Sequence, residues 1–198
     1  MPAKSPLAML VIDMQLGLFS SRQPRYQSSS VIANINRLLD ACHVQGIPVI
    51  FIQHDGPIGD ELEPFSQGWE LLPTLHRNAA DHRLRKSSCD SFYRTGLQPL
   101  LHSLGVKSLI VTGCPTDYCI DSTLRMALSL DYQCYAVSDA HTTADRPHMD
   151  ARSIITHHSS VWRNLISPKP VQLLTTQRML EEMGKPHKQD NPRLVSVV

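Results

Sequence analysis

The sequence predicts an α/β fold with three layers, in which helices cover both faces of a parallel sheet. Short apolar segments alternate along the chain with longer segments of helical periodicity, a pattern typical of β–α–β units. The chain has 198 residues, 41% hydrophobic and 19% charged, which suits one domain with a substantial core. We expect this domain over residues 1–180 and a polar, extended tail over residues 181–198.

The first half of the chain supplies two strands and one helix. Leu7–Ile12 is a continuous apolar run that predicts a buried strand, and Ile47–Ile52 predicts a second. Between them, apolar residues recur at helical spacing until Gly46, which predicts a helix that ends there (Val31, Ile35, Leu38, Leu39, Cys42). Residues 53–85 contain many Gly and Pro, so we expect a functional loop region or short helices there.

The second half repeats a strand–helix pattern. The expected elements are a helix at Leu97–Leu104, a strand at Ser108–Thr112, a helix from Thr116 to Leu130, a strand at Gln133–Val137, a helix around Pro147–His158 and a strand at Val171–Leu174. Parallel sheets of this kind bind ligands beyond the carboxyl ends of their strands, where the strand order reverses. Asp13 and the segment 113–119 directly follow two of the expected strands.

Charge and cysteine content exclude several functions. The net charge is +1 with the two signs interspersed, which argues against nucleic-acid or membrane binding and favours a small-molecule partner. The apolar run near the start is too short for a signal peptide or a membrane span, so we expect a cytoplasmic protein. The five cysteines form no CxxC pair, which indicates at least one free thiol. No GxGxxG or Walker A motif follows a strand, so we expect no cofactor.

Cys119 and Asp13 are the candidates for chemistry. Thr116 is a potential N-cap, which would place Cys119 in the first helical turn, where the helix dipole favours a thiolate. Asp13 ends an apolar strand and could accept the thiol proton, with Lys86, Arg83 or Arg85 as a compensating cation. Each residue also has a structural interpretation: Cys119 as a small buried side chain, Asp13 as a loop cap and Lys86 as a surface lysine.

Four segments carry a family resemblance. They are Leu10–Gln15, Lys86–Phe92, Gly113–Asp121 and Ser138–Ala140. Their combination and spacing resemble the isochorismatase-like cysteine hydrolases, in the metal-free branch with streptothricin hydrolase-like amidases. The resemblance covers roughly residues 7–175.

The resemblance implies a Rossmann-like, six-stranded parallel sheet, assembly into a homodimer or homotetramer, and a catalytic triad. By matching motif the triad is Asp13, Lys86 and Cys119. It implies hydrolysis of a C–N bond in a small amide or carbamoyl substrate through a thioester. Two alternatives stay open: vinyl-ether hydrolysis of isochorismate, and a non-catalytic scaffold for binding or assembly.

The resemblance also implies a cis peptide before the nucleophile, here between Cys114 and Pro115. Proline lowers the cost of a cis bond but has no N–H, which at this position serves the family as an oxyanion donor. We expect the Cys119 N–H, helped by the Thr116 N–H or a water, to bind the oxyanion in its place.

Metal and substrate residues are less defined. Metal-binding relatives carry a D-x-H element after the second strand, whereas this chain has His54 followed by Asp55, so we predict no metal. Expected substrate-contacting side chains are His54 and four aromatic residues, each of which could instead be structural (Phe19, Trp69, Phe92, Tyr118).

Overall fold

A six-stranded parallel sheet forms the centre of the protein. The computed structural model describes residues 6–20 and 23–185. The strands are β1 (Leu7–Ile12), β2 (Val49–His54), β3 (His82–Lys86), β4 (Ser108–Gly113), β5 (Gln133–His141) and β6 (Gln172–Leu174). Their order in the sheet is β3-β2-β1-β4-β5-β6, and every neighbouring pair is parallel. The predicted Rossmann-like α/β fold is confirmed.

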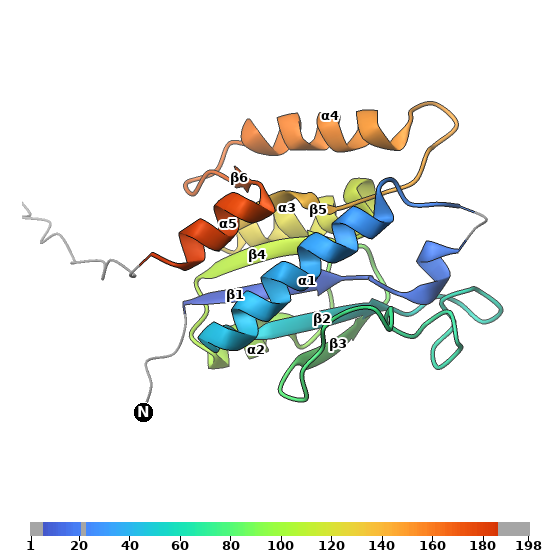
Figure 1. Ribbon diagram of the computed structural model, residues 1–198, viewed down its shortest axis with the longest axis horizontal. Coiled ribbons are helices and arrows are strands. Elements are labelled where there is room, and N and C mark those ends of the chain that lie inside the picture. The colour runs from blue at the N-terminus through green and yellow to red at the C-terminus, as the bar shows by residue number, and fades with distance from the viewer. Residues whose placement is uncertain (1–5, 21–22, 186–198) are drawn as a thin grey trace, which may run out of the picture.

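Helices cover both faces of the sheet. They are α1 (Ser28–Gln45), α2 (Leu97–Ser103), α3 (Asp121–Ser129), α4 (Ala151–Arg163) and α5 (Thr176–Met183). Helices α1 and α5 pack on one face, while α2, α3 and the Trp162 end of α4 contribute to the core of the other (Figure 1). Alternate residues of the central strands point to opposite faces; on β1, Met9 joins the first core and Leu10 the second.

The sequence pattern of α1 explains its position. The five apolar residues predicted to share one face are the five that the helix buries. Gly46 ends the helix with a positive φ of 65°, a conformation that glycine adopts without strain. The helix prediction is therefore confirmed in both its buried face and its end.

The strand order reverses between β1 and β4, and this is where the functional loops begin. Ile12, the last residue of β1, pairs with Gly113, the last of β4. Gly113 has a φ of 121°, and a Cβ there would lie 2.1 Å from the carbonyl oxygen of Ile12. Glycine is thus required for the two strand ends to approach this closely.

Three elements differ from the sequence prediction. Residues 82–86 form the edge strand β3 rather than loop; its alternating, mostly charged residues are typical of an exposed edge and gave no apolar run. Helix α4 begins at Ala151, because the Asp150 side chain accepts a hydrogen bond from the Ser153 N–H and caps it. Helix α5 was not predicted, and it extends to Met183, inside the expected tail.

The remainder of the tail, residues 186–198, lies outside the described residues. Across the described ranges 6–20 and 23–185, no helix is long and apolar enough to cross a membrane.

Candidate active site

Three side chains from distant parts of the sequence meet beyond the carboxyl ends of the strands. Asp13 directly follows β1, Lys86 is the last residue of β3, and Cys119 lies in a π-helical turn, Thr116–Ile120, between β4 and α3. The Lys86 Nζ lies 2.8 Å from Oδ2 of Asp13 and 3.2 Å from Sγ of Cys119. The structure therefore brings the predicted triad together around one ammonium group, and it selects Lys86 over the neighbouring arginines.

Lys86 is fixed by further contacts. Its Nζ donates to the carbonyl oxygen of Ser88 at 3.0 Å and lies 3.3 Å from Nδ1 of His54. Burial opposes the charged ammonium, but the negative charge of Asp13 and the neighbouring Cys119 outweigh it, so the pKa of Lys86 is raised. Lys86 is therefore a buried cation of the site and not the solvated surface lysine of the structural interpretation.

The surroundings of Cys119 favour the protonated thiol. Burial raises its pKa, and the negative charge of Asp13 raises it further, while Lys86 acts in the opposite direction. This direction is opposite to the predicted stabilisation of a thiolate by the helix dipole, because desolvation and the adjacent carboxylate both act against the thiolate. A base must therefore remove the thiol proton when the residue reacts.

Asp13 is positioned to be that base. Its φ is 50°, and its backbone N–H donates to the carbonyl oxygen of Ile52 at 2.8 Å, which turns the chain sharply at the strand end. Its side chain is fully buried, pairs with Lys86 and lies within hydrogen-bonding reach of the Cys119 thiol. The carboxylate retains free lone pairs beside the thiol.

The loop before the nucleophile differs in part from expectation. The Cys114–Pro115 bond is cis in the structure. Thr116 is not an N-cap: its side-chain oxygen lies 2.9 Å from Nδ1 of His141, and Pro115 occupies the cap position. The Thr116 N–H donates to the carbonyl oxygen of Thr142, so this group is not available as an oxyanion donor.

His54 contacts Lys86 and also lines an adjacent pocket. Two hydrogen bonds with the buried Gln15 side chain hold its backbone, one from the His54 N–H at 2.8 Å and one to the His54 carbonyl at 3.0 Å. Burial and the Lys86 charge lower the pKa of His54, which keeps the ring neutral beside the ammonium. Gln15 was not predicted as a site residue, although a Gln two residues after the strand-terminal Asp13 was a usable signal.

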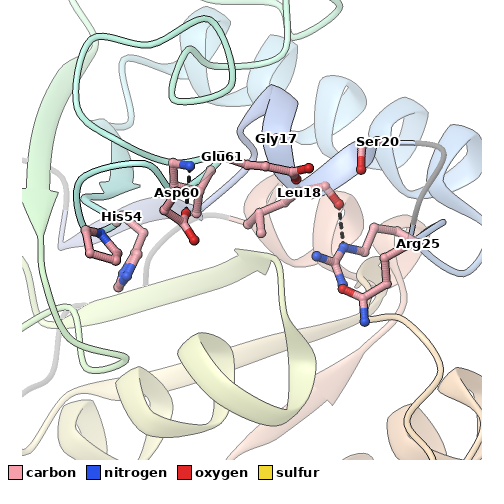
Figure 2. A pocket seen from close by; sticks show the side chains of 11 residues that line it. Gly17, Leu18, Ser20, Arg25, His54, Asp60 and Glu61 are labelled. Carbon is pink, nitrogen blue, oxygen red and sulfur yellow. Dashed lines mark hydrogen bonds between the residues drawn. The ribbon is translucent and has the colours of Figure 1, made fainter.

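The pocket has a volume of about 470 Å³ and lies between two loops that follow β1 and β2. Figure 2 shows His54 and Arg25 on opposite sides of it. Its wall is completed by residues of both loops (Gly17, Leu18, Ser20, Gln23, Gly56, Pro57, Asp60, Glu61, Leu62). A cavity of this size suits a small molecule.

The four predicted aromatic contacts do not line this pocket. Phe19 packs against the α1 face of the core, and Phe92 stacks on Tyr132 with ring centroids 5.9 Å apart. Trp69 is 9% exposed and its Nε1 donates to Asp55 at 2.8 Å. In the structure these three side chains make packing or hydrogen-bonding contacts within the protein, and their contact with a substrate stays a prediction.

Tyr118 is placed beside the nucleophile in sequence but points away from the core. It is half-exposed, and the Arg146 guanidinium lies 4.7 Å from its ring centroid. Arg146 in turn pairs with Asp117 at 2.8 Å, which holds the π-helical turn against the segment after β5. The ion pair was not foreseen, since the two residues are far apart in sequence.

The residues next to His54 do not form a metal site in this arrangement. Asp55 pairs with Arg85 at 2.7 Å and accepts the Trp69 Nε1 hydrogen bond, so its carboxylate is turned toward that cation. Within ranges 6–20 and 23–185, no group of three or more His, Cys, Asp or Glu side chains could hold a metal ion.

Several known proteins resemble the chain. Residues 7–157 match the family model described as the isochorismatase domain. The chain is 34% identical over 140 residues to streptothricin hydrolase of Streptomyces noursei, covering 71% of this chain but only 51%, about half, of that relative's length. It is 29% identical over 177 residues to ureidoacrylate amidohydrolase of Serratia proteamaculans, covering 70% of each. A crystal structure of an isochorismatase family protein has a TM-score of 0.80 at 32% identity and covers 87% of this chain and 100% of that one.

Proposed function

Because the chain belongs to the isochorismatase family, we propose that it is a cysteine hydrolase that cleaves the C–N bond of a small amide or carbamoyl substrate. The observation that carries this proposal is the contact of one buried ammonium, Lys86 Nζ, with both Asp13 and Cys119. A thiol, a carboxylate and a compensating cation at this range form a nucleophile with its base. The names of the two relatives, a streptothricin hydrolase and an ureidoacrylate amidohydrolase, support an amide-type substrate.

In the first half of the reaction, Asp13 takes the proton of the Cys119 thiol as the sulfur attacks the substrate carbonyl carbon. The S–C bond forms, and the carbonyl electrons move to oxygen, where the Cys119 N–H donates a hydrogen bond. The oxyanion then collapses, the C–N bond breaks, and Asp13 returns the proton to the leaving nitrogen. The acyl group remains on Cys119 as a thioester.

In the second half, a water replaces the amine. Asp13 accepts one water proton as the water oxygen attacks the thioester carbon, and the C–S bond breaks as the second tetrahedral intermediate collapses. The proton on Asp13 then returns to the sulfur, and the acid product leaves. Throughout both halves, Lys86 stays charged and offsets the negative charge that passes between Asp13 and Cys119.

The two alternatives explain less of the site. Vinyl-ether hydrolysis requires no nucleophilic sulfur, so it leaves the contact of Lys86 with Cys119 without a role. A scaffold without activity leaves a fully buried Asp–Lys pair that is costly to desolvate. Such a pair next to a pocket is more typical of an active site than of a structural core.

The test is a screen of primary amides and carbamoyl compounds for ammonia release, with wild-type protein and the Cys119→Ala variant in parallel. We expect ammonia from a subset of compounds, and none with Cys119→Ala at an unchanged circular dichroism spectrum. Cys134→Ala, which alters a buried thiol in the core behind the sheet, is the matched control and should remain active. Hydroxylamine added during turnover should trap the thioester as a hydroxamate.

Two results would contradict the proposal. Turnover of an amide by Cys119→Ala at the wild-type rate would remove the nucleophile. Hydrolysis of isochorismate by both proteins, with no amide accepted by either, would favour the vinyl-ether reaction.

A further inference from the structure

Arg25 is a buried cation without a complete set of partners. It is 8% exposed, and its Nε donates to the carbonyl oxygen of Leu18 at 2.6 Å. Its Nη1 is buried and has no hydrogen-bond partner among the described residues. A buried guanidinium that lacks a carboxylate partner is costly, because both its charge and its N–H groups have left water unpaired. Such a group is expected to gain its partner from a ligand.

The position of Arg25 makes that ligand the substrate. Arg25 and His54 line the same pocket from opposite sides (Figure 2), and the His54 ring is in turn 3.3 Å from the catalytic Lys86 ammonium. A molecule that fills the pocket therefore has His54, which contacts the triad lysine, at one end and the guanidinium at the other.

Backbone hydrogen bonds connect Tyr26, the residue after Arg25, to the segment that also contacts the turn containing Cys119. The N–H of Tyr26 donates to the carbonyl oxygen of Thr143 at 2.9 Å, and the Thr142 hydroxyl donates to the carbonyl oxygen of Tyr26 at 2.6 Å. The carbonyl oxygen of Thr142 also accepts the N–H of Thr116, three residues before Cys119. The residue after Arg25 is thus bonded to the same segment as the turn that contains Cys119, although the two are far apart in sequence.

The other charged residues that the structure describes on the pocket wall are acidic. Asp60 and Glu61 lie on the wall, and Oδ1 of Asp60 accepts the Leu62 N–H at 2.8 Å (Figure 2). The Asp60 carboxylate disfavours a second carboxylate near it. An anionic group that enters the pocket is therefore directed to Arg25, where it meets the unpaired Nη1.

We infer that Arg25 binds a carboxylate of the substrate, so that the substrate is an acid that carries its amide or carbamoyl group at the opposite end. This inference rests on the proposed function and adds the substrate class to it. The recognition is a charge-assisted hydrogen bond from the guanidinium to the carboxylate, which is stronger than a neutral one.

The experiment compares matched pairs of substrates. The monoamides of malonic, succinic, glutaric and adipic acids each carry a carboxylate, and the corresponding diamides replace it with a neutral amide of equal length. For the best chain length we expect kcat/KM to favour the monoamide by about 10- to 100-fold. In Arg25→Met this preference should disappear, because KM for the monoamide rises toward that for the diamide. Arg25→Lys, which keeps the positive charge, should retain part of the preference for the monoamide.

The matched control is Arg152→Met, an exposed arginine on α4, which should keep the full preference. A purely structural Arg25 would lower activity on monoamides and diamides alike, without changing their ratio. Equal kcat/KM values for the monoamide and the diamide in the wild type would overturn the inference. An unchanged preference for the monoamide in Arg25→Met would overturn it too. If Arg25→Met fails to fold, an unchanged ratio in Arg25→Lys would overturn it as well.

Binding distinguishes this inference from the proposed function. Isothermal titration of Cys119→Ala with the same compounds should show tighter binding of monoamides, and the preference should be lost in the Cys119→Ala/Arg25→Met double variant. Such binding without turnover by the wild type would reject the hydrolase but keep the carboxylate site. Turnover of diamides alone would keep the hydrolase and reject the carboxylate site.

Discussion

Lys86 Nζ lies 2.8 Å from Oδ2 of Asp13, and both side chains are fully buried. Lys86 comes from the edge strand β3 and Asp13 from the central strand β1, so the lysine reaches across the end of β2 to form the pair. The two charges offset one another, which allows both to exist away from water. Burial and the charge of Asp13 raise the pKa of the adjacent Cys119 thiol, whose proton Asp13 can accept.

Asp13→Asn should abolish turnover and at the same time make Cys119 more reactive. The charge of Asp13 raises the pKa of the thiol, and its removal leaves the Lys86 ammonium with a thiolate as its natural counterion. We expect iodoacetamide at neutral pH to alkylate Cys119 at least about ten times faster than in the wild type, because one unit of pKa is a tenfold change in thiolate. Mass spectrometry of tryptic peptides measures this rate, with the other four cysteines as internal standards.

Lys86→Met should have the opposite effect on the reactivity of Cys119. Among the main causes of the Cys119 pKa shift, Lys86 is the one that lowers the thiol pKa. Its removal should therefore slow alkylation of Cys119, and turnover should also be lost. Breaking a buried pair costs about 3–5 kcal/mol of unfolding free energy, so folding of both variants is checked by thermal melting. Slower alkylation in Asp13→Asn than in the wild type would show that the carboxylate does not hold the thiol protonated.

Pro115→Ala should increase kcat. The substitution supplies an N–H at a position where the proline has none, and the Thr116 N–H cannot replace it because it donates to Thr142. One oxyanion donor is worth about 10²–10³ in rate, which sets the upper limit of the gain. Steady-state kinetics on every accepted amide measures the effect, and a folded variant that is no faster on any of them would refute the missing-donor argument.

Stability should fall as the pH drops from about 6.5 toward 4, in part because of His141. Burial, aided by the nearby His158, lowers the pKa of His141 from 6.5 to about 4. Between these values the unfolded chain binds a proton at this ring and the folded protein does not, so acid favours unfolding. The difference corresponds to about 3 kcal/mol, fully lost near pH 4.

The measurement for His141 is urea unfolding across this pH range. His141→Asn, which keeps a polar group facing Thr116, should lose less stability on acidification than the wild type. His148→Asn, at an exposed position after β5, is the control and should follow the wild-type profile. Parallel profiles for all three proteins would rule out His141 as a source of the acid sensitivity.

Removal of metal ions should leave turnover unchanged. The prediction rests on the order of His54 and Asp55 in the sequence and on the contact of Asp55 with Arg85. Dialysis against EDTA followed by the ammonia assay tests it, with a metal analysis of the same sample. A large loss of activity that zinc or manganese restores would contradict the prediction.

The order and type of most elements were predictable because they depend on local patterns. The apolar run of β1 and the buried stripe of α1 specify their structure from a few neighbouring residues. The edge strand β3 was missed because an exposed edge needs no apolar run, and its pairing with β2 supplies the hydrogen bonds that stabilise it. Short α5 was missed because its few apolar residues gain their stability by packing against α1 and β5.

The sequence by itself determined that Asp13 and Cys119 follow strands of one parallel sheet, and the motif resemblance added Lys86. Only the tertiary structure decided that Lys86 faces both residues, that the pKa of the thiol is raised, and that Arg25 ends the pocket with an unpaired N–H. These properties depend on burial and on charges that are distant along the chain. Local sequence patterns specify secondary structure, whereas desolvation and Coulomb interactions are set by which segments meet when the sheet is complete.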